Sequence, residues 1–538
     1  MDYETITMSS NLIKRNRIMI NAGEIGRHAW FKIGCFFSLN VQIVCVEFYF
    51  YLKMNFLTFF DNVWSHNILL CIIIFYLLSS ISFAAHFSCC DKFDRPILLN
   101  SFNSFSVFFI GLFFWLFCFD FVINDKLYFF SQNLHLLFIF FIGCVMYSSY
   151  DFLVVKNIIK YEYDLLFIFV VFSGVCLCFC NEFLLIYLGI ELQSLTLYIF
   201  ATFNRNSEFS TEAGLKYFVF GGIMSCFLLF GFCLIYLYYG SITFELISSI
   251  TNFSYEPMFF SGFFFVIIVL MFKVGSAPFH FWLCDVYEGS LLPVTLLFSS
   301  APKIVLFGLL FKICFFVLFD YNLIWFYIIG FSAVISIMIG SISAIYQKRI
   351  KRLFAYSTIA HTGFILLAFL CCSLDASKAL IFYILIYSCL TITTFAILIN
   401  IAASTSVQPK YLINLAAIGS KNYIFSVALG LNILATAGIP PLAGFFSKFF
   451  ILLSVIGAEY YFTALVIIIF SSIACFYYIR IIKIMFFLKT SKNTIWITNK
   501  TKMNTEFVIS FFLFVVLCLF LRPNLFVDFS SAIGLTLF

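Results

Sequence analysis

Residues 258–283 read MFFSGFFFVIIVLMFKVGSAPFHFWL. The stretch is long and apolar enough to cross about 30 Å of hydrocarbon as a helix, but it holds Lys273 and then Gly275-Ser276-Ala277-Pro278. Proline lacks a backbone donor and clashes with the preceding turn, so a break at Pro278 should leave carbonyl groups free. Irregular backbone at membrane depth is tolerated only inside protein or beside a wet cavity. The stretch therefore predicts a broken transmembrane helix with a charged side chain beside the break.

The whole chain has the composition of an integral membrane protein. Apolar residues make up 63% of its 538 residues and charged residues 10%, far from the balance of soluble domains. Apolar stretches of sufficient length recur at 67–90, 98–124, 127–148, 162–180, 183–203, 214–238, 258–283, 290–319, 321–346, 353–372, 377–403, 422–457, 459–486 and 506–528. The period-two pattern of a membrane barrel is absent, so we predict an all-α polytopic membrane protein with about 14 transmembrane helices. A fifteenth span at 30–52 is less apolar, and a position in the membrane interface is the alternative.

Basic residues are concentrated in alternate loops. They occur in the loops 150–161, 204–213, 347–352, 404–421 and 487–505, and are absent from the opposite loops 239–257, 373–376 and 529–538. The positive-inside rule predicts that the first set faces the cytoplasm or the mitochondrial matrix. The net charge of +6 is thus an orientation signal, and scattered basic residues of this kind predict no nucleic-acid partner.

The sequence predicts no cofactor or metal bound by the chain itself. Its 19 cysteines form no paired C-x-x-C clusters of the kind that hold zinc or iron–sulfur centres. No phosphate-binding loop or nicotinamide fingerprint is present either. Any redox centre is therefore expected on partner proteins. The 81 phenylalanines suit lipid-facing helices, and they also suit an organellar gene rich in A and T.

A second broken helix is predicted at 422–457, which is too long for one straight span and contains Gly438-Ile439-Pro440-Pro441. Two consecutive groups of five spans then carry a break in the fourth member of each, at Pro278 and at Pro440 and Pro441. Because five is odd, the second group is inverted relative to the first, as in many ion-translocating proteins. The predicted organisation is an N-terminal extension over 1–66, three helices over 67–161, a first repeat over 162–320, an inverted repeat over 321–490 and a C-terminal helix over 491–538.

Charged or titratable residues fall on matching members of the two groups. The candidates for a proton relay are Glu191, Lys273, Lys303, Lys448, His361 and Lys216. A charge at mid-membrane costs about 2.5–3.5 kcal/mol, so it faces a partner or a wet cavity. A buried ammonium releases its proton more readily than one in water, and a nearby carboxylate reverses this effect. A pair such as Lys273 with Glu191 could therefore switch its proton affinity, whereas a static ion pair that fixes helix packing is the alternative.

Other titratable residues are weaker candidates. His280 lies beside the first break and could be either a relay member or a solvated end residue. Structural roles are favoured for His135, Glu47 and Asp120. A solvated turn on the basic side is expected for Asp285 and Glu288.

Four motifs resemble one known family. The stretch FKVGSAPFHFWLCDVYEGSLLPVTLLFSSAPKIVLFGLL (272–310) is similar to subunit 2 of respiratory complex I, the proton-translocating NADH:ubiquinone oxidoreductase. The stretches LGIELQSLTLY (188–198), IKRLFAYSTIAHTGF (350–364) and TAGIPPLAGFFSKF (436–449) resemble the same family in the same order. The resemblance covers roughly residues 67–528. The turn Asp285-Val286-Tyr287-Glu288-Gly289 favours subunit 2 over the related subunits 4 and 5.

The resemblance implies two half-channels for protons, with Glu191 and Lys273 as the paired gate, Lys303 at the centre and Lys448 in the far half. It also implies Lys216 and His361 as members of a hydrated axis. The electrons would pass through NADH, FMN, iron–sulfur clusters and quinone on partner subunits. The expected neighbours are the antiporter-like subunit 4, small membrane subunits and lipids, in the mitochondrial inner membrane. Cys284, where the family usually has proline, and the N-terminal extension depart from the pattern.

Three other functions stay open at this point. A free-standing cation/proton antiporter could use the same repeat, although no clear sodium-site motif is present. A plastid relative would take its electrons from ferredoxin. A scaffold could retain the charges without moving protons.

Overall fold

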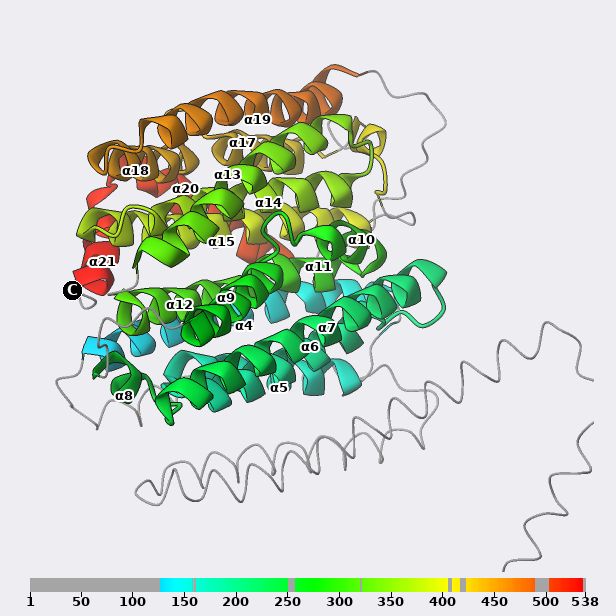
Figure 1. The fold of residues 1–538 in the computed structure, drawn as a ribbon. Coiled ribbons are helices and arrows are strands. Elements are labelled where there is room, and N and C mark those ends of the chain that lie inside the picture. Colours follow the sequence, from blue (N-terminus) through cyan, green and yellow to red (C-terminus); the bar gives the residue numbers. More distant parts are fainter. Residues whose placement is uncertain are drawn as a thin grey trace, which may run out of the picture. The chain divides into compact units, whose positions relative to one another are not determined.

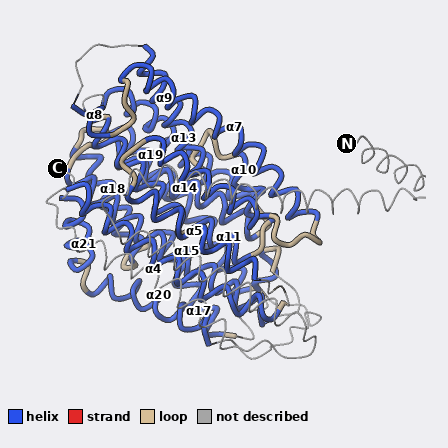
Figure 2. Tube along the Cα trace, turned by 90° about the horizontal axis from the view of Figure 1, so that it is seen from below, coloured by secondary structure: helices blue, strands red, loops and turns tan. Residues whose placement is uncertain are grey.

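Helices make up almost all of the chain that the structure describes. The structure, a computed structural model, describes residues 126–156, 158, 161–249, 257–319, 322–404, 409–416, 422–488 and 503–535. Within these ranges no β-strand forms, and extended pairing is limited to the isolated bridges Glu182 with Thr243 and Arg349 with Tyr411. Figure 2 shows how completely helices account for these ranges. The predicted all-α membrane architecture is confirmed.

Nine helices in the described ranges are long and apolar enough to cross a membrane. The predicted spans 30–52, 67–90 and 98–124, the extension over 1–66, and Glu47 and Asp120 all lie outside the described residues. The predicted repeat boundaries and the sidedness of the loops stay predictions.

The first group of helices extends from α4 to α12 (Figure 1). Its members are α4 (Lys126–Val155), α5 (Tyr161–Phe179), α6 (Phe183–Ala201), α7 (Glu208–Tyr239), the short α8 (Phe244–Ser249), α9 (Pro257–Val274), α10 (Phe281–Gly289), α11 (Leu292–Ser299) and α12 (Ala301–Lys312). Consecutive helices pack side by side, α5 on α6, α6 on α7 and α7 on α9. Helices α7 and α9 approach closely at two glycines: a Cβ on Gly231 would lie 2.8 Å from the carbonyl oxygen of Gly262. Small residues bring helices together in lipid in this way.

The second group extends from α13 to α19. Its members are α13 (Asn322–Tyr346), α14 (Ile350–Phe369), α15 (Leu374–Ser404), a 3₁₀ turn (Leu412–Leu415), α17 (Tyr423–Ala437), α18 (Ala443–Gly457) and α19 (Tyr461–Phe487). Two C-terminal helices follow, α20 (Met503–Leu521) and α21 (Asn524–Leu535). Helix α15 packs against α11 of the first group as well as against α14, α17 and α18.

Both predicted helix breaks are confirmed. Helix α9 ends at Val274 and α10 begins at Phe281, while α17 ends at Ala437 and α18 begins at Ala443. Gly275 and Gly438 follow the ends of α9 and α17 with φ of +83° and +85°. This left-handed conformation is open to glycine and strained for other residues. Each break contains a cis X-Pro peptide, at Ala277–Pro278 and Pro440–Pro441.

Two spans predicted as continuous are interrupted. The stretch 290–319 divides at Ser300 into α11 and α12, and a π-helix over Ile313–Val317 follows α12. Pro302 lies in the first turn of α12, where proline is favoured, and it disfavours helical backbone just before it. The stretch 506–528 likewise ends at Leu521, and α21 starts after Pro523. In both cases the proline was visible in the sequence, but the length of the apolar run predicted one continuous span.

Burial differs sharply between the spans. The spans Leu292–Val317 and Leu374–Ser404 are 100% buried over their most apolar window, whereas Glu208–Tyr239 and Tyr461–Phe487 are only 33% buried. Helices α7 and α19 are therefore suited to face lipid, and α11, α12 and α15 form the interior. A polar group on an interior helix is shielded from hydrocarbon by its neighbours.

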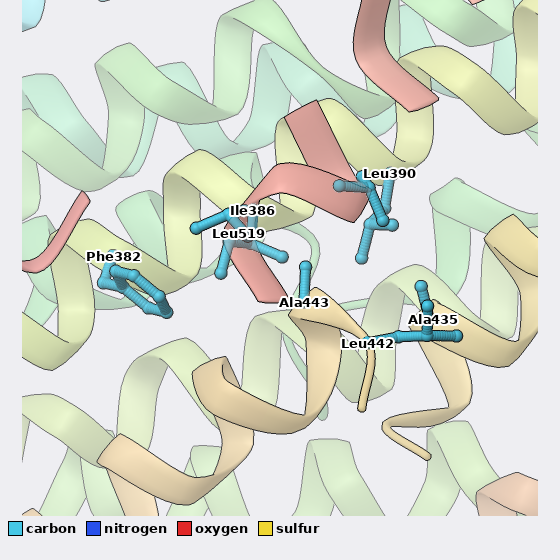
Figure 3. Packing of buried hydrophobic residues seen from close by; sticks show 8 residues of the cluster. Phe382, Ile386, Leu390, Ala435, Leu442, Ala443 and Leu519 are labelled. Atoms are coloured by element: carbon cyan, nitrogen blue, oxygen red, sulfur yellow. The ribbon is translucent and has the colours of Figure 1, made fainter. Parts of the chain in front are cut away.

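An apolar cluster holds the second break against the interior. Phe382, Ile386 and Leu390 of α15 pack with Ala435 of α17, with Leu442 and Ala443 at the start of α18, and with Val516 and Leu519 of α20 (Figure 3). The α15 residues recur every four positions, so they form one stripe of that helix. Because the stripe touches both sides of the break, the two half-helices are fixed relative to α15.

Candidate functional site

At the first break, backbone N–H groups and a neighbouring indole donate to the last carbonyls of α9. Gly275 N–H and Ser276 N–H both donate to the carbonyl of Met271, 3.0 Å away in each case. The indole N–H of Trp282, on α10, donates to the carbonyl of Phe272 at 3.0 Å. The same carbonyl also accepts from Gly275 N–H at 3.0 Å, so the indole is its second donor. Trp282 therefore ties α10 to the end of α9, beside Lys273.

Lys273 is buried next to this break without a hydrogen-bond partner. Its side chain is 7% exposed, and its ammonium nitrogen has no donor or acceptor within reach in the described part of the chain. It lies 5.8 Å from the centre of the Tyr198 ring, a distance at which an aromatic face attracts a cation. Glu191, on α6, is half-buried and accepts a hydrogen bond of 3.2 Å from the Ser194 hydroxyl.

The predicted pair of Glu191 and Lys273 is separated in this structure. No ion pair joins these two side chains among the described residues, although the carboxylate is close enough to act on Lys273 electrostatically. The two side chains therefore do not form a static ion pair in the described part of the chain.

A first cavity connects Lys273 with Lys303. Its volume is about 20 Å³, and a cavity of roughly 10–15 Å³ can hold one water molecule. The lining residues are Ile190, Gln193, Ser194, Leu197, Tyr217, Lys273, Trp282, Phe298, Pro302, Lys303 and Leu306. Two buried donors without partners, the Lys273 ammonium and the Gln193 amide nitrogen, are among these residues. The cavity therefore offers a site where water could accept from both.

Lys303 is buried at the start of α12. It lies in the first turn of α12, directly after the interruption at Ser300, and its side chain is 4% exposed. Its ammonium donates a hydrogen bond of 3.4 Å to the hydroxyl of Tyr387 on α15. The same ammonium lies 5.6 Å from the centre of the Tyr387 ring. Tyr387 thus contacts a lysine that lines the first cavity.

His361 lies between two tyrosine hydroxyls. Its Nδ1 is 2.8 Å from the hydroxyl of Tyr383, and its Nε2 is 3.1 Å from that of Tyr478. A neutral imidazole donates through one nitrogen and accepts through the other. One tyrosine must therefore donate to the ring while the other accepts from it, so a change of tautomer reverses both hydrogen bonds.

A second cavity, also of about 20 Å³, contains His361 and Lys448. Its lining residues are Phe354, Ser357, Thr358, His361, Tyr383, Ile386, Tyr387, Leu390, Thr391, Thr394, Phe395, Thr436, Gly444, Ser447, Lys448 and Tyr478. The hydroxyls among them come from α14, α15, α17, α18 and α19. Hydroxyl groups from five helices therefore line this cavity.

Lys448, on α18, contacts the backbone at the second break. Its ammonium donates a hydrogen bond of 2.6 Å to the carbonyl of Ala437, the last residue of α17. It also lies 5.6 Å from the centre of the Phe364 ring. The carbonyl freed by the second break therefore binds a charged side chain, where the first break uses an indole.

Lys216 lies in a different environment from the other candidates. Its ammonium pairs with Glu212 at 2.8 Å and with Asp285 at 2.9 Å, and its side chain is 40% exposed. It lines neither cavity. The structure therefore does not bring Lys216 together with the four candidates that line the cavities, and its part in the relay stays a prediction. Glu191 lines neither cavity either.

The expectation of a solvated turn at Asp285 and Glu288 was wrong. Both residues lie on helix α10 and pair with arginines of the segment that begins α14. Asp285 contacts Arg352 at 2.9 Å, and Glu288 contacts both Arg349 and Arg352. The short loop before α14 brings these arginines against α10, which loop sequences alone do not predict. The result is an ion-pair network that joins α7, α10 and α14.

The two other histidines in the described ranges line neither cavity. His280 precedes α10, is half-buried and stacks on Phe281 with ring centres 5.2 Å apart. His135 is fully buried on α4 and packs against Phe179. No group of three metal-binding side chains occurs in the described ranges.

Sequence reasoning missed the tyrosines and one lysine. Tyr383 and Tyr387 are four residues apart on the same face of α15, a pattern in an interior span that could have drawn attention. Lys312 is 2% exposed and donates to the carbonyl of Cys178 near the end of α5. It stands in the same apolar stretch as Lys303, and a charge in such a run is the signal that could have identified it.

The chain matches the family model described as NADH:quinone oxidoreductase/Mrp antiporter, transmembrane, over residues 180–474. This range covers more than half of the 538 residues and includes Glu191, Lys273, Lys303, His361 and Lys448. It also contains both breaks.

Relatives and a solved structure agree with this match. NADH-ubiquinone oxidoreductase chain 2 of Marchantia polymorpha is 39% identical over 291 residues, which are 53% of this chain and 58% of the relative. NADH-quinone oxidoreductase subunit N 1 of Rhizobium meliloti is 36% identical over 285 residues, 53% of this chain and 59% of the relative. The chain thus spans less than two thirds of the length of these curated relatives.

The fold is similar to that of a chain in respiratory complex I from Thermus thermophilus with bound aureothin. The TM-score is 0.67 at 23% identity, over 86% of this chain and 98% of that chain. At this identity the likeness shows the fold alone. Together with the match of the family model, these similarities show that the chain belongs to the NADH:quinone oxidoreductase/Mrp antiporter family of multi-pass membrane proteins.

Proposed function

We propose that the chain is a proton-translocating, antiporter-like membrane-arm subunit of an NADH:quinone oxidoreductase, the counterpart of chain 2. The names of its relatives support this assignment. The observation that supports it most is the succession of buried polar groups. Lys273 and Lys303 share one cavity, Lys303 bonds to Tyr387, and Tyr387 shares a second cavity with His361 and Lys448.

In this proposal Glu191 and Lys273 are the gate. The approach of the carboxylate holds a proton on the lysine, and separation of the two allows the proton to leave. The proton then passes to Lys303 through the first cavity, and to His361 and Lys448 in the second. Lys216, in its exposed network with Asp285, would act at the entrance and not within the buried series.

The chain supplies proton transfer only, and its partners supply the electron transfer. NADH, FMN, iron–sulfur clusters and quinone would be bound by other subunits of the complex. The neighbours proposed are the antiporter-like subunit 4 and small membrane subunits, in the mitochondrial inner membrane. The plant relative named for ubiquinone supports that location, and bacterial membranes are the alternative given the subunit N relatives.

A stand-alone cation/proton antiporter is the second candidate, because the family description includes the Mrp antiporter. The two functions differ in assembly and in ion dependence. A subunit of the oxidoreductase co-migrates with NADH dehydrogenase activity on native gels, and its proton transport needs NADH and quinone. An antiporter moves protons in response to a sodium gradient without NADH, and that result would replace the proposal.

Variants at the gate test the mechanism. Lys273→Met and Glu191→Gln are expected to assemble normally while proton translocation and the coupled reduction of quinone fall together. A loss on the order of tenfold or more is expected, as for other positioned proton-transfer groups. Wild-type proton-to-electron ratios and rates in an assembled complex would instead favour a scaffold that retains its charges without moving protons.

A further inference from the structure

We propose that the Tyr387 hydroxyl is the bridge through which protons pass between the two cavities. The two cavities have no lining residue in common. Lys303 lines the first cavity and Tyr387 lines the second. The hydrogen bond of 3.4 Å between these two side chains joins them. This inference rests on the proposed proton translocation and names the residue on which its central step depends.

The position of Tyr387 on α15 suits this role. It is 5% exposed and stands on an interior helix, so lipid and bulk water do not reach it. Its ring centre lies 5.4 Å from that of His361 and its hydroxyl accepts from Lys303. A proton that leaves Lys303 toward the second cavity meets this hydroxyl first.

The transfer is a proton hop that balances without any redox partner. The Lys303 ammonium loses a proton to the Tyr387 oxygen, forming a new O–H bond. The original O–H bond breaks at the same time, and its proton passes to a water molecule in the second cavity, which has room for one. Tyr387 stays neutral, Lys303 becomes neutral and the second cavity gains one positive charge. Rotation of the hydroxyl then restores the starting hydrogen bond.

His361 is not the direct recipient in this step. Both of its ring nitrogens already have tyrosine partners, Tyr383 and Tyr478. The water that receives the proton would lie among the hydroxyls of the second cavity, from where Lys448 takes up the proton after it has released its own. The proposal therefore assigns Tyr387 a different task from the other two tyrosines.

Two substitutions separate a bridging role from a packing role. Tyr387→Phe keeps the ring and removes the hydroxyl, so it blocks the hop while preserving the packing. Tyr387→Ser removes the ring and leaves space in which water can enter and bridge Lys303 to the second cavity. A bridging role therefore predicts more proton translocation in the Ser variant than in the Phe variant. A packing role predicts the reverse order.

The experiment compares proton translocation in vesicles that contain the assembled complex, normalised to assembled complex on native gels. Tyr387→Phe should lower translocation on the order of tenfold, and Tyr387→Ser should recover a measurable part of it. Tyr163→Phe is the matched control, because Tyr163 is a buried tyrosine on α5 that lines neither cavity. It should translocate at the wild-type rate.

Lys303→Met, measured in parallel, separates failure of this inference from failure of the proposed function. If Lys303→Met abolishes translocation and Tyr387→Phe does not lower it, the bridge is wrong and the relay stands. If Tyr387→Ser translocates protons no faster than Tyr387→Phe, the bridging role of Tyr387 is also wrong. If Lys303→Met translocates normally, both the relay and the bridge are wrong.

Discussion

The Lys448 ammonium lies 2.6 Å from the carbonyl oxygen of Ala437, the last residue of α17. A helix that breaks inside a membrane must satisfy its free carbonyls within the protein. Here the side chain that does so is also a member of the proposed proton relay. The second break and the charge beside it are therefore one structural unit.

Replacement of Lys448 should affect both stability and transport. Lys448→Met leaves the Ala437 carbonyl with the Cys475 thiol, 3.5 Å away, which is a weak donor. We expect a loss of about 1–3 kcal/mol in stability, measured as a lower thermal midpoint of the purified complex, together with reduced proton translocation. Lys483→Met, an exposed lysine on α19, is the control. An unchanged midpoint for Lys448→Met would show that the carbonyl does not depend on the lysine.

Gly438 fixes the position of Lys448. Its φ is +85°, and a Cβ at this position would lie 2.9 Å from Lys448 Cδ and 3.0 Å from Lys448 Nζ. Gly438→Ala should therefore displace the ammonium and strain the backbone, at a cost of about 1 kcal/mol or more. Gly222→Ala is the matched control, because a Cβ there meets nothing within 4 Å. Proton translocation should fall in Gly438→Ala and stay normal in Gly222→Ala. Equal rates of translocation in the two variants would show that a Cβ at position 438 does not displace Lys448.

The network around α10 should depend on its more buried carboxylate. The Glu288 side chain is 16% exposed and pairs with two arginines. The Glu212 side chain is 59% exposed and, among the residues that the structure describes, pairs with Lys216 alone. Exposed ion pairs contribute about 0–1 kcal/mol, while removing one partner of a more buried pair costs more. We expect Glu288→Gln to lower the thermal midpoint of the complex more than Glu212→Gln does. The opposite order would show that α10 is held mainly by its apolar contacts.

The sequence predicted the helix breaks better than it predicted helix continuity. The breaks at Pro278 and Pro440 followed from proline chemistry in spans that were otherwise too apolar or too long. The interruption at Ser300 has the same cause, but Pro302 stands inside a run whose hydropathy predicts one span. Hydropathy measures composition over a window and does not detect a single residue that redirects the backbone.

The titratable residues were predictable, and their partners were not. A charge in an apolar run is visible in the sequence, as for Lys273, Lys303 and Lys448. The hydroxyls that contact Lys303 and His361 come from helices far away in the chain: Tyr387 is 84 residues from Lys303, and Tyr478 is 117 residues from His361. Such contacts depend on which faces of interior helices meet. A tyrosine in a membrane span is too common a residue to identify a site by itself.

We propose that buried lysines lining the two cavities carry protons, whereas a lysine buried elsewhere does not. Lys303 and Lys312 lie on the same helix, are 4% and 2% exposed, and differ in that only Lys303 lines a described cavity. The most direct measurement is the ratio of protons translocated to electrons transferred by the assembled complex carrying Lys303→Met or Lys312→Met. We predict a lower ratio or a parallel loss of both activities for Lys303→Met, and a wild-type ratio and rate for Lys312→Met. Wild-type ratio and rate for Lys303→Met in a fully assembled complex would contradict the account.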